Sequence, residues 1–405
     1  MPNESNSEKL WSWHDRHGFS RIINVSGTMT SLGASVTSQA VSEATAAAMG
    51  RFVRMHELQA KASAAICELT GAEAGFMTAS ASAGLTLTIA GCITGLDPAR
   101  VEALPKNPGA KSEIIVQLGH LCGYGAPVET AVSLAGATAR PVGQSTLCMD
   151  HQLAGAIDDH TAAALYVVSH HVVSYGQIPF PTFVEICHSR NIPVIVDAAS
   201  EYDVTGFIKA GADLVIYSAH KFLGGPTGGI VAGRRDLVRA AYLQNIGIGR
   251  GMKIGKESIA GAIAAMRNWM TRDHAAARAT EDAALQLWLS AVAQIPGVEP
   301  EIVADPTGNP LNRLQINIDP VQAGTSAATL ARALSQQDPA LIVRDHETEL
   351  GYFQLDPCNL LPGQAGIVAE TLASVLKSSS DFPEEPQDAS RARNGGVTGH
   401  LTWLD

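Results

Sequence analysis

The sequence lacks any apolar run near the roughly 20 residues that a membrane-spanning helix needs. Residues 1–21 also lack the charged start, the apolar middle and the small-residue cleavage site of a signal peptide. Close cysteine pairs are missing too, and the six cysteines are scattered at Cys67, Cys92, Cys122, Cys148, Cys187 and Cys358. That spacing excludes a disulfide framework and a zinc knuckle and is typical of thiols in a reducing compartment. These absences predict a soluble, cytoplasmic protein with no membrane partner and no metal site.

Basic residues are in deficit, with 28 Lys and Arg against 39 Asp and Glu, which gives a formal net charge of −11. The field of such a molecule repels polyanions, so we expect no nucleic-acid partner, although a local basic patch stays possible. Charged residues make up only 17% of the 405 residues and hydrophobic residues 46%, which excludes disorder for most of the chain. The length allows two domains with a sizeable core.

Short apolar runs alternate with amphipathic stretches through the middle of the chain, which predicts an α/β layer fold. Continuous apolar runs bounded by turn residues are typical of strands buried on both faces of a mostly parallel sheet. The predicted strands are Ile114–Gln117, Ala164–Ser169, Pro193–Asp197 and Asp213–Tyr217. The predicted helices between them are Val128–Ala135, Pro181–Arg190 and a short one before Gly211.

The pattern changes after about Lys256, where two long Ala-rich helical stretches precede alternating strand-like and helical pieces. We therefore expect an N-terminal segment over residues 1–50, a large domain over 51–256, a smaller C-terminal α+β domain over 257–378 and a flexible tail over 379–405. The last apolar residues, Leu401–Leu404, favour docking on this subunit or on a neighbour.

The most informative segment is Tyr217-Ser-Ala-His-Lys-Phe-Leu-Gly-Gly-Pro-Thr-Gly-Gly229, in which a lysine and a run of glycines follow a strand. A lysine that forms an imine must be fixed in place and kept partly neutral. Glycines allow tight turns and close approach of the backbone to a flat ligand or another subunit. Ser218, three residues before Lys221, can offer its hydroxyl to a phosphate. The alternative is a surface lysine in a glycine-rich loop.

A second candidate residue for such a site is the carboxylate of Asp197. The strand Pro193–Asp197 ends in Asp197, at the rim where open α/β sheets bind ligands. Pyridoxal phosphate needs a carboxylate against its ring nitrogen, which keeps the ring protonated and an electron sink. Asp197 could instead cap a helix. An Asp on one strand and a lysine just past the next is more specific than either residue alone.

A third segment, Thr78-Ala-Ser-Ala-Ser-Ala-Gly84, opens an apolar helical stretch over 85–95. Small residues at a helix N-terminus let backbone N–H groups and hydroxyls bind an anion. We assign this loop to the cofactor phosphate, with Ser82, Ala83 and Ser218 as the predicted contacts. A plain serine N-cap is the alternative.

Together these residues resemble the selenocysteine synthase-like family of fold type I pyridoxal-phosphate enzymes. The resemblance lies in Ser218-Ala-His-Lys221, Leu223-Gly-Gly-Pro226 and Val196-Asp197, with support from Arg21-Ile-Ile-Asn-Val-Ser-Gly27 and Gly249-Arg-Gly-Met-Lys-Ile-Gly-Lys256. The family includes seryl-tRNA selenium transferases and D-glucosaminate-6-phosphate ammonia-lyases. One departure is His220, where the selenium transferases carry an acidic residue. The resemblance implies an aspartate aminotransferase-like large domain, pyridoxal 5'-phosphate as cofactor and a homodimer or larger symmetric oligomer.

The resemblance also implies roles for single residues. Lys221 resembles the lysine that binds the cofactor covalently, Asp197 its pyridinium partner and His120 the residue that stacks on the ring. His171, preferred over His170, is the predicted neighbour of the cofactor oxygen or the substrate, and Arg344 is predicted to bind the substrate carboxylate. Arg250, within a basic run with Lys253 and Lys256, is the predicted contact of a substrate or cofactor phosphate. The alternatives are ordinary loop histidines, a strand-end arginine in a surface ion pair and a solvated helix start.

The reaction that the resemblance favours is α,β-elimination of a hydroxy-amino acid. The best candidate is D-glucosaminate or its 6-phosphate, converted to a 2-keto-3-deoxy acid and ammonia. Racemisation and transamination share the first proton removal by Lys221 and stay open. tRNA-dependent selenium transfer is an alternative of a different class, disfavoured by the net charge of −11 and by the roughly 20 residues that precede the Arg21 motif. A non-catalytic binding protein is disfavoured because Lys221 and Asp197 are both present.

Overall fold

The computed structural model describes residues 6–384 and 397–404, and the chain divides into two compact units. The larger unit spans Ser35–Arg272, and the smaller one combines Met1–Ala34 with Asp273–Asp405. Within the described residues, no helix is both long enough and apolar enough to cross a membrane. All six cysteines are free thiols.

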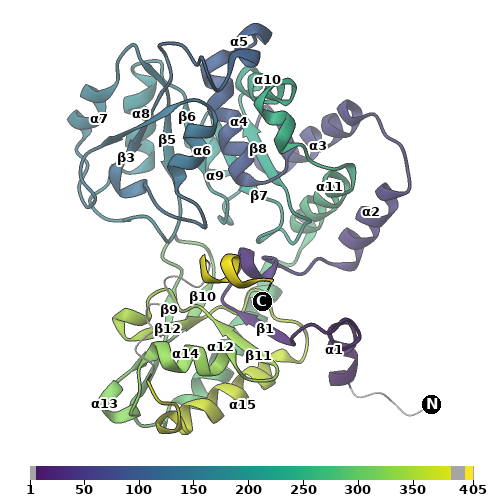
Figure 1. The fold of residues 1–405 in the computed structure, drawn as a ribbon, viewed down its shortest axis with the longest axis vertical. Helices are drawn as coiled ribbons and strands as arrows, with labels where there is room; N and C mark the ends of the chain where they lie inside the picture. Colours follow the sequence, from purple (N-terminus) through teal and green to yellow (C-terminus); the bar gives the residue numbers. More distant parts are fainter. Residues whose placement is uncertain (1–5, 385–396, 405) are drawn as a thin grey trace. The chain divides into compact units, whose positions relative to one another are not determined.

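The larger unit contains a seven-stranded sheet with the strand order β2-β8-β7-β6-β5-β3-β4 (Figure 1). The strands are β2 (Ala74–Thr78), β3 (Glu113–Gln117), β4 (Thr138–Val142), β5 (Thr161–Val167), β6 (Val194–Asp197), β7 (Leu214–Ser218) and β8 (Gly229–Gly233). Strand β8 pairs antiparallel with both β2 and β7, and the remaining pairs are parallel. The predicted mostly parallel sheet is confirmed, and every strand of this sheet except β8 ends at the same edge.

Both faces of this sheet are buried because its apolar side chains alternate between two cores. Ile115 packs into one core, while Ile114 and Val116 pack into the other. Helices α3, α8 and α11 contribute to the first core, and α4, α6 and α10 to the second. The helices of the unit are α2 (Gln39–Met49), α3 (Met55–Thr70), α4 (Ala81–Thr94), α5 (Pro98–Ala103), α6 (Val128–Leu134), α7 (Asp150–Ala156), α8 (Phe180–His188), α9 (Gly206–Lys209), α10 (Arg235–Leu243) and α11 (Lys256–Thr271), with 3-10 turns η2 (Leu118–His120), η3 (Gln244–Ile246) and η4 (Ile248–Met252).

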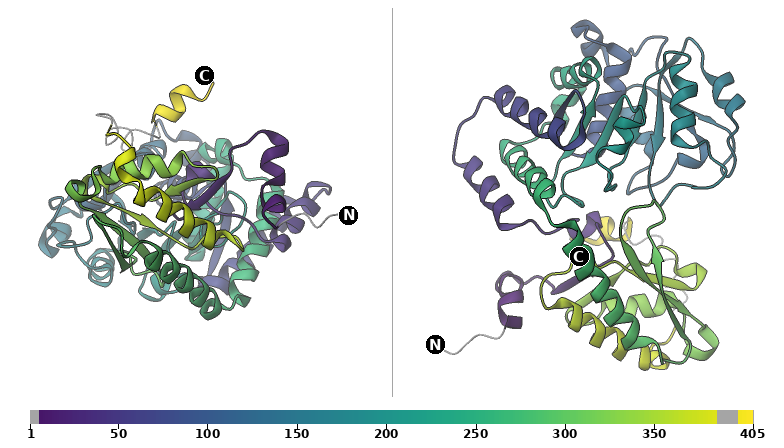
Figure 2. Two further views of the ribbon diagram at one scale, coloured as in Figure 1. Left: turned by 90° about the horizontal axis from the view of Figure 1, so that it is seen from below. Right: turned by 180° about the vertical axis from the view of Figure 1, so that it is seen from behind.

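The smaller unit is an α+β structure with two sheets of its own. Strand β1 pairs parallel with β11, and β12, β10 and β9 form an antiparallel sheet. Helices α12 and α15 lie side by side over a core that includes Trp288 and Phe353 (Figure 2). Its elements are α1 (Asn6–His17), β1 (Ile22–Val25), η1 (Thr30–Leu32), α12 (His274–Val292), β9 (Val298–Ala304), β10 (Asn312–Ile318), α13 (Pro320–Ala323), α14 (Ala327–Ser335), β11 (Ala340–Val343), η5 (Thr348–Leu350), β12 (Tyr352–Leu355), α15 (Gln364–Lys377) and η6 (Ser379–Asp381).

The division into units differs from the predicted boundaries at both ends of the large domain. Helix α11 packs on α2 and α3, so the larger unit runs to Arg272 and not to residue 256. The predicted N-terminal segment 1–50 is split, because its strand β1 pairs with β11 of the smaller unit while α2 packs in the larger one. Of the predicted tail 379–405, residues 385–396 and Asp405 lie outside the described residues. Residues 397–402 are helical, and Leu401, Trp403 and Leu404 are exposed.

Candidate functional site

Several of the predicted site residues lie at one edge of the large sheet. Asp197 is the last residue of β6, Ser218 is the last residue of β7, and Lys221 follows in the turn after β7. Strands β6 and β7 are parallel neighbours, so their carboxyl ends lie side by side. The strand β2 that leads into Ser80–Ser82 ends at this edge as well, since Thr78 and Ser218 both pair with Gly229. The topology therefore brings the lysine, the carboxylate and the small-residue loop to a common rim.

Lys221 is held by a neighbour that follows Asp197 along the chain. Its Nζ donates a hydrogen bond to Ser200 Oγ at 2.5 Å. Burial lowers the pKa of Lys221, while the Asp197 and Glu201 carboxylates oppose that shift. A buried amine with a lowered pKa spends a larger fraction of its time as the neutral nucleophile. The site therefore meets the requirement for a fixed and partly neutral lysine.

Asp197 is buried at the sheet edge and has few internal partners. Its Oδ1 accepts a hydrogen bond from the Ala199 amide at 3.2 Å. Burial raises the pKa of Asp197, and the Lys221 ammonium and the Ala199 amide lower it. A buried carboxylate is stabilised in its charged form by a cation placed against it. Asp197 is thus suited to bind a protonated ring nitrogen.

The loop before α4 forms the third side of the site. Ser80 is the N-cap of α4, and its Oγ accepts from the Ala83 amide at 3.0 Å. The N-cap role therefore applies to Ser80, and it occupies the amide of Ala83, which is one of the predicted phosphate contacts. The first-turn amides of Ala81 and Ser82 are the donors left for an anion. Tyr124 donates its hydroxyl to Ser82 Oγ at 3.4 Å.

Glycine is required next to this loop for a steric reason. A Cβ on Gly229 would lie 2.2 Å from the carbonyl oxygen of Ser80. The segment that closely approaches the glycine run is therefore this chain's own loop at Ser80. This contact places the N-terminus of α4 against the start of β8.

His120 lies in the η2 turn directly after β3 and is 2% exposed. Its Nδ1 accepts a hydrogen bond from the Val167 backbone amide at 3.2 Å, and its ring meets the Tyr166 ring edge to face, with centroids 4.6 Å apart. Burial lowers the pKa of His120 to about 4. His120 is therefore a buried, neutral side chain at the carboxyl edge of the sheet, and its contact with the cofactor ring stays a prediction.

Other predicted site residues of the larger unit are more exposed. His171 is exposed and its ring lies 3.9 Å from that of His170, centroid to centroid, while His170 is half-buried. Arg250 is exposed in η4, the 3-10 turn after α10. Their predicted contacts with cofactor or substrate stay predictions.

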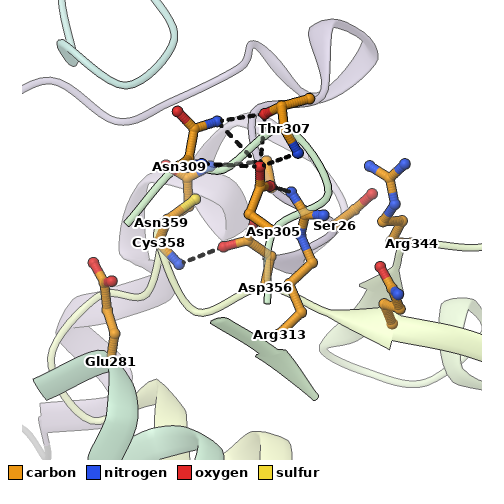
Figure 3. Close-up of polar contacts among 12 residues, drawn as sticks. Ser26, Glu281, Asp305, Thr307, Asn309, Arg313, Arg344, Asp356, Cys358 and Asn359 are labelled. Carbon is orange, nitrogen blue, oxygen red and sulfur yellow. Dashed lines mark hydrogen bonds and ion pairs between the residues drawn. The ribbon is translucent and has the colours of Figure 1, made fainter. Parts of the chain in front are cut away.

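Arg344 belongs to the smaller unit, where it follows β11 and is 4% exposed. The expected alternative of a surface ion pair is therefore wrong. Its Nη2 donates to Glu347 at 3.3 Å, and its Nε is buried with no hydrogen-bond partner in the described part of the chain. Figure 3 shows Arg344 beside a buried polar cluster in which Arg313 bridges Asp305 and Asp356. The unpartnered N–H of Arg344 is a donor that an anionic ligand could satisfy.

The same cluster anchors the N-terminal segment of the chain. The Asp356 amide donates to the Val25 carbonyl at 2.8 Å, and Asn359 Nδ2 donates to the carbonyls of Gly27 and Ala34 at 2.8 and 3.0 Å. Gly27 has a φ of +87°, and a Cβ there would lie 3.1 Å from Asp356 Oδ2. The Arg21–Gly27 motif is therefore the segment that docks on this cluster.

Pyridoxal phosphate fits the chemistry of the rim in the larger unit. The edge offers a buried lysine, a buried carboxylate and a helix N-terminus, which are the groups needed for its aldehyde, its ring nitrogen and its phosphate. Two buried polar atoms there, Thr78 Oγ1 and His220 Nδ1, have no hydrogen-bond partner among the residues that the structure describes. They lie at the end of β2 and beside Lys221, where the cofactor would supply partners.

Sequence reasoning missed several residues of this edge. In the sequence, Ser200 is only a small residue three positions after Asp197, and Glu201 is the acidic residue that follows it. Gln117 and Tyr124 flank His120 in the chain, but neither carries a motif. Their roles come from contacts between elements, which a single sequence does not show.

The family model described as L-seryl-tRNA selenium transferase, SelA, matches residues 22–295. The chain is 35% identical over 364 residues to the D-glucosaminate-6-phosphate ammonia lyase of Salmonella typhimurium, covering 90% of this chain and 98% of the relative. It is also 35% identical over 371 residues to the 5'-C-glycyluridine monooxygenase-decarboxylase of a Streptomyces species, covering 91% and 93%.

Solved structures agree with the predicted fold class. The structure of a D-glucosaminate-6-phosphate ammonia-lyase matches with a TM-score of 0.81 at 33% identity, covering 94% of this chain and all of that one. Aspartate aminotransferase from Thermus thermophilus matches with a TM-score of 0.53 at 14% identity, which shows the fold alone. The predicted aspartate aminotransferase-like α/β fold is confirmed.

Proposed function

The chain belongs to the SelA family, and from that premise we propose that it is a pyridoxal-phosphate-dependent ammonia-lyase acting on D-glucosaminate or its 6-phosphate. The observation that supports this best is the match to the D-glucosaminate-6-phosphate ammonia lyase, which extends over 98% of that relative with a TM-score of 0.81 to a solved lyase. In the proposed reaction the substrate loses its α-proton and its β-hydroxyl as water. A later hydrolysis step consumes one water and releases ammonia. The net products are therefore a 2-keto-3-deoxy acid and ammonia.

The cofactor, when bound, withdraws electrons from the substrate and makes its α-proton acidic. Lys221 would hold the cofactor and afterwards take that proton, since burial lowers the pKa of its amine. Asp197 would hold the ring nitrogen protonated, and the amides of Ala81 and Ser82 with Ser218 would bind the phosphate. His120 would pack on the ring face. Arg344, with its buried unpartnered Nε, would bind the substrate carboxylate, and Arg250 and His171 would contact substrate or cofactor.

A second function is favoured by a specific observation. The 5'-C-glycyluridine monooxygenase-decarboxylase is as similar as the lyase, with 35% identity over a comparable length. Such a reaction begins with the same polarised α-carbon but consumes O2 and releases CO2. The tRNA-dependent selenium transferase reaction is less favoured, since a net charge of −11 repels tRNA.

The deciding experiment is a visible absorption spectrum of the protein reconstituted with pyridoxal phosphate, before and after D-glucosaminate and its 6-phosphate are added, in air and without oxygen. Ammonia and 2-keto acid formed equally under both conditions support the lyase and show whether the phosphate is needed. Oxygen consumption and CO2 release from 5'-C-glycyluridine, with no ammonia from the sugar acids, would replace it with the oxygen-dependent reaction. If the reconstituted wild type shows no absorption band of bound pyridoxal phosphate, as is expected of Lys221→Ala, both proposed reactions are rejected.

We propose further that the protein is a cytoplasmic homodimer or a larger symmetric oligomer. The six free cysteines support a reducing compartment. The oligomer is supported by exposed apolar side chains around the connection from α2 to α3, which include the fully exposed Phe52.

A further inference from the structure

Four polar residues of the smaller unit are buried although they point away from its apolar core. Each is the chain neighbour of a core residue at a strand position, in the pairs Val25-Ser26, Val343-Arg344, Leu355-Asp356 and Arg313-Leu314. Successive side chains of a strand point to opposite faces, so the polar member of each pair lies on the face opposite the core. These polar residues are only 3–7% exposed. The smaller unit therefore buries a polar layer as well as an apolar one.

Ser26 and Arg344 occupy matching positions in this layer. Strands β1 and β11 pair in parallel with Val25 opposite Val343, and Ser26 and Arg344 are the next residue of each chain segment. Ser26 also forms a bridge with Asp356, whose carboxylate accepts from Arg313 Nε at 3.3 Å. Figure 3 shows Ser26 between the Arg313 and Arg344 side chains. The serine hydroxyl thus belongs to the same cluster as the two guanidinium groups.

The donors of this cluster are incompletely satisfied. Ser26 Oγ, Arg344 Nε and Arg313 Nη1 are buried with no hydrogen-bond partner among the described residues. The turn at Ser26 does not depend on the hydroxyl, because the Ser26 backbone amide donates to Asn24 Oδ1 at 2.9 Å. Glu347 accepts only from Nη2 of Arg344. Buried polar atoms are costly when unpaired, so native proteins usually pair them with a ligand or a water.

An anion fits the unpaired donors best. Burial lowers the pKa of Arg344, and the nearby Arg313 guanidinium acts in the same direction, while the Glu347 carboxylate opposes it. A negative charge bound at Arg344 would stabilise its charged form. A carboxylate accepts on two oxygens, so a single one can pair with an N–H of Arg344 and with the O–H of Ser26.

We propose that Ser26 is a substrate-binding residue, whose hydroxyl donates to one oxygen of the substrate carboxylate while Arg344 Nε donates to the other. This rests on the proposed function, which assigns the substrate carboxylate to Arg344. The ligand class is a small acid with an amino or hydroxyl group on its α-carbon. The Arg21–Gly27 motif then has a second role besides docking, since the segment that Asp356 and Asn359 anchor carries the serine hydroxyl to Arg344.

The test measures carboxylate binding by the protein loaded with pyridoxal phosphate. The probes are D-gluconate, the 2-hydroxy analogue of D-glucosaminate, and glycolate, which has a carboxylate but none of the sugar chain. Neither probe has an amine, so neither can form an imine with the cofactor. Binding is followed as the rise in unfolding temperature with probe concentration, against sodium chloride of equal ionic strength. D-glucitol, which has the hydroxyl chain without the carboxylate, is the uncharged control.

We expect Ser26→Ala to need roughly 10- to 100-fold more of either carboxylate for the same shift, as for one hydrogen bond to a charged group. Thr325→Val is the matched control, because Thr325 is 1% exposed in the same unit and its Oγ1 also has no partner in the described part of the chain. Without probe, neither substitution should lower the unfolding temperature, since each removes a buried hydroxyl that is unpaired. Only Ser26→Ala should weaken carboxylate binding.

Three results would overturn the proposal. They are a Ser26→Ala protein that binds the carboxylates as the wild type does, a Ser26→Ala protein that is less stable without probe, and a wild type that neither carboxylate stabilises beyond the salt control. The ammonia assay separates this proposal from the proposed reaction. If the sugar acids release no ammonia while glycolate binding depends on Ser26, the lyase is wrong and the carboxylate contact stands. If Ser26→Ala releases ammonia with the KM of the wild type, the lyase stands and the contact is wrong.

Discussion

Lys221 combines two opposing influences, and its pKa decides how readily it reacts. Burial lowers that pKa. Asp197, Glu201 and the Ser200 hydroxyl, which accepts a hydrogen bond from Lys221 Nζ at 2.5 Å, stabilise the ammonium. Removing the acceptor in Ser200→Ala should therefore lower the pKa of Lys221 further, by roughly one unit for one charge-assisted hydrogen bond. We expect the rate of covalent pyridoxal phosphate binding to keep its plateau but to reach it at a lower pH.

The measurement is the pH dependence of the rate at which cofactor absorption appears in the purified protein. Ser200→Thr keeps the hydroxyl and serves as the matched control, with a profile close to that of the wild type. A profile that moves to higher pH in Ser200→Ala would mean that Ser200 does not stabilise the ammonium.

Single residues differ in how far the sequence could identify them. Lys221 and Asp197 were predictable because each follows an apolar strand and carries a residue type that the chemistry requires. Ser80, which caps α4, could not be told apart from Ser82 in a run of small residues, since only the hydrogen bond to Ala83 distinguishes them. The sequence marks Gln117 only as the last residue of a strand. Its contacts with Ile178 could not be predicted because that segment lies about sixty residues away in the chain.

The strands that the sequence predicts are those whose residue composition is typical of a buried strand. Strands β3, β5, β6 and β7 are rich in Ile, Val and Leu or in buried Ala, and their predicted ranges overlap the observed ones. Strands β2 and β8, with the sequences Ala-Gly-Phe-Met-Thr and Gly-Ile-Val-Ala-Gly, were missed because glycine disfavours strands on its own. Strand β1 was missed because its partner β11 is about 320 residues further along the chain.

The glycines at the start of β8 give a paired test of how the α4 loop is seated. A Cβ on Gly229 would lie 2.2 Å from the Ser80 carbonyl oxygen, which is backbone and cannot yield without moving the loop. On the adjacent Gly228 the nearest atoms are the side-chain ends of Ile254 and Met77, at 3.2 and 3.3 Å. We expect Gly229→Ala to weaken pyridoxal phosphate binding at least tenfold and to lower stability by roughly 1–3 kcal/mol.

Gly228→Ala is the control and should change both quantities far less. The measurements are cofactor affinity by absorption titration and thermal unfolding of the cofactor-free protein. Similar losses in the two variants would argue against a loop that is fixed by close contact at Gly229.

The polar cluster of the smaller unit gives a second prediction about elements. Arg313 is 7% exposed and is neutralised by Asp305 at 2.5 Å and Asp356 at 3.3 Å. Asp305→Ala leaves the guanidinium short of one buried partner, which typically costs about 3–5 kcal/mol. We expect denaturant unfolding to show a loss of this size and early release of residues 22–27, detected by hydrogen exchange.

A surface ion pair provides the contrast. Arg54→Ala removes a pair with Glu57 in which both side chains are well exposed, and it should change stability by about 1 kcal/mol or less. If Asp305→Ala were as mild, the cluster would not hold the N-terminal segment.

At the scale of the whole molecule, the comparisons give one family and relatives with two different reactions. Two relatives at 35% identity, a lyase and a monooxygenase-decarboxylase, cover nearly all of the chain. Both functions need a polarised α-carbon, so Lys221, Asp197 and the α4 loop fit either one. The residues that choose between elimination and reaction with oxygen contact the substrate, and no motif in the sequence marks them.

The oligomeric state is a property of the whole molecule, and a substitution of Phe52 can test it. Phe52 lies in the connection between α2 and α3 and is fully exposed, and Met49, Val53 and Met55 beside it are exposed as well. The connection is held in place by Lys256, whose Nζ lies 5.8 Å from the Phe52 ring centre and donates to the Arg51 carbonyl. An ordered apolar patch of this kind is expected to be buried by a second copy of the chain.

We therefore expect the wild type to have at least a dimer mass in light scattering, and Phe52→Glu to dissociate it. Burying one such side chain is worth about 1.5–3 kcal/mol, and a two-fold interface counts the change twice, so the dissociation constant should rise by roughly 10²–10⁴-fold. Val321→Glu alters a similarly exposed residue on α13 and should leave the mass unchanged. A monomeric wild type would refute the oligomer, and equal dissociation in both variants would place the interface elsewhere. Cofactor binding that weakens together with the dimer would show that the site at the sheet edge depends on the second copy.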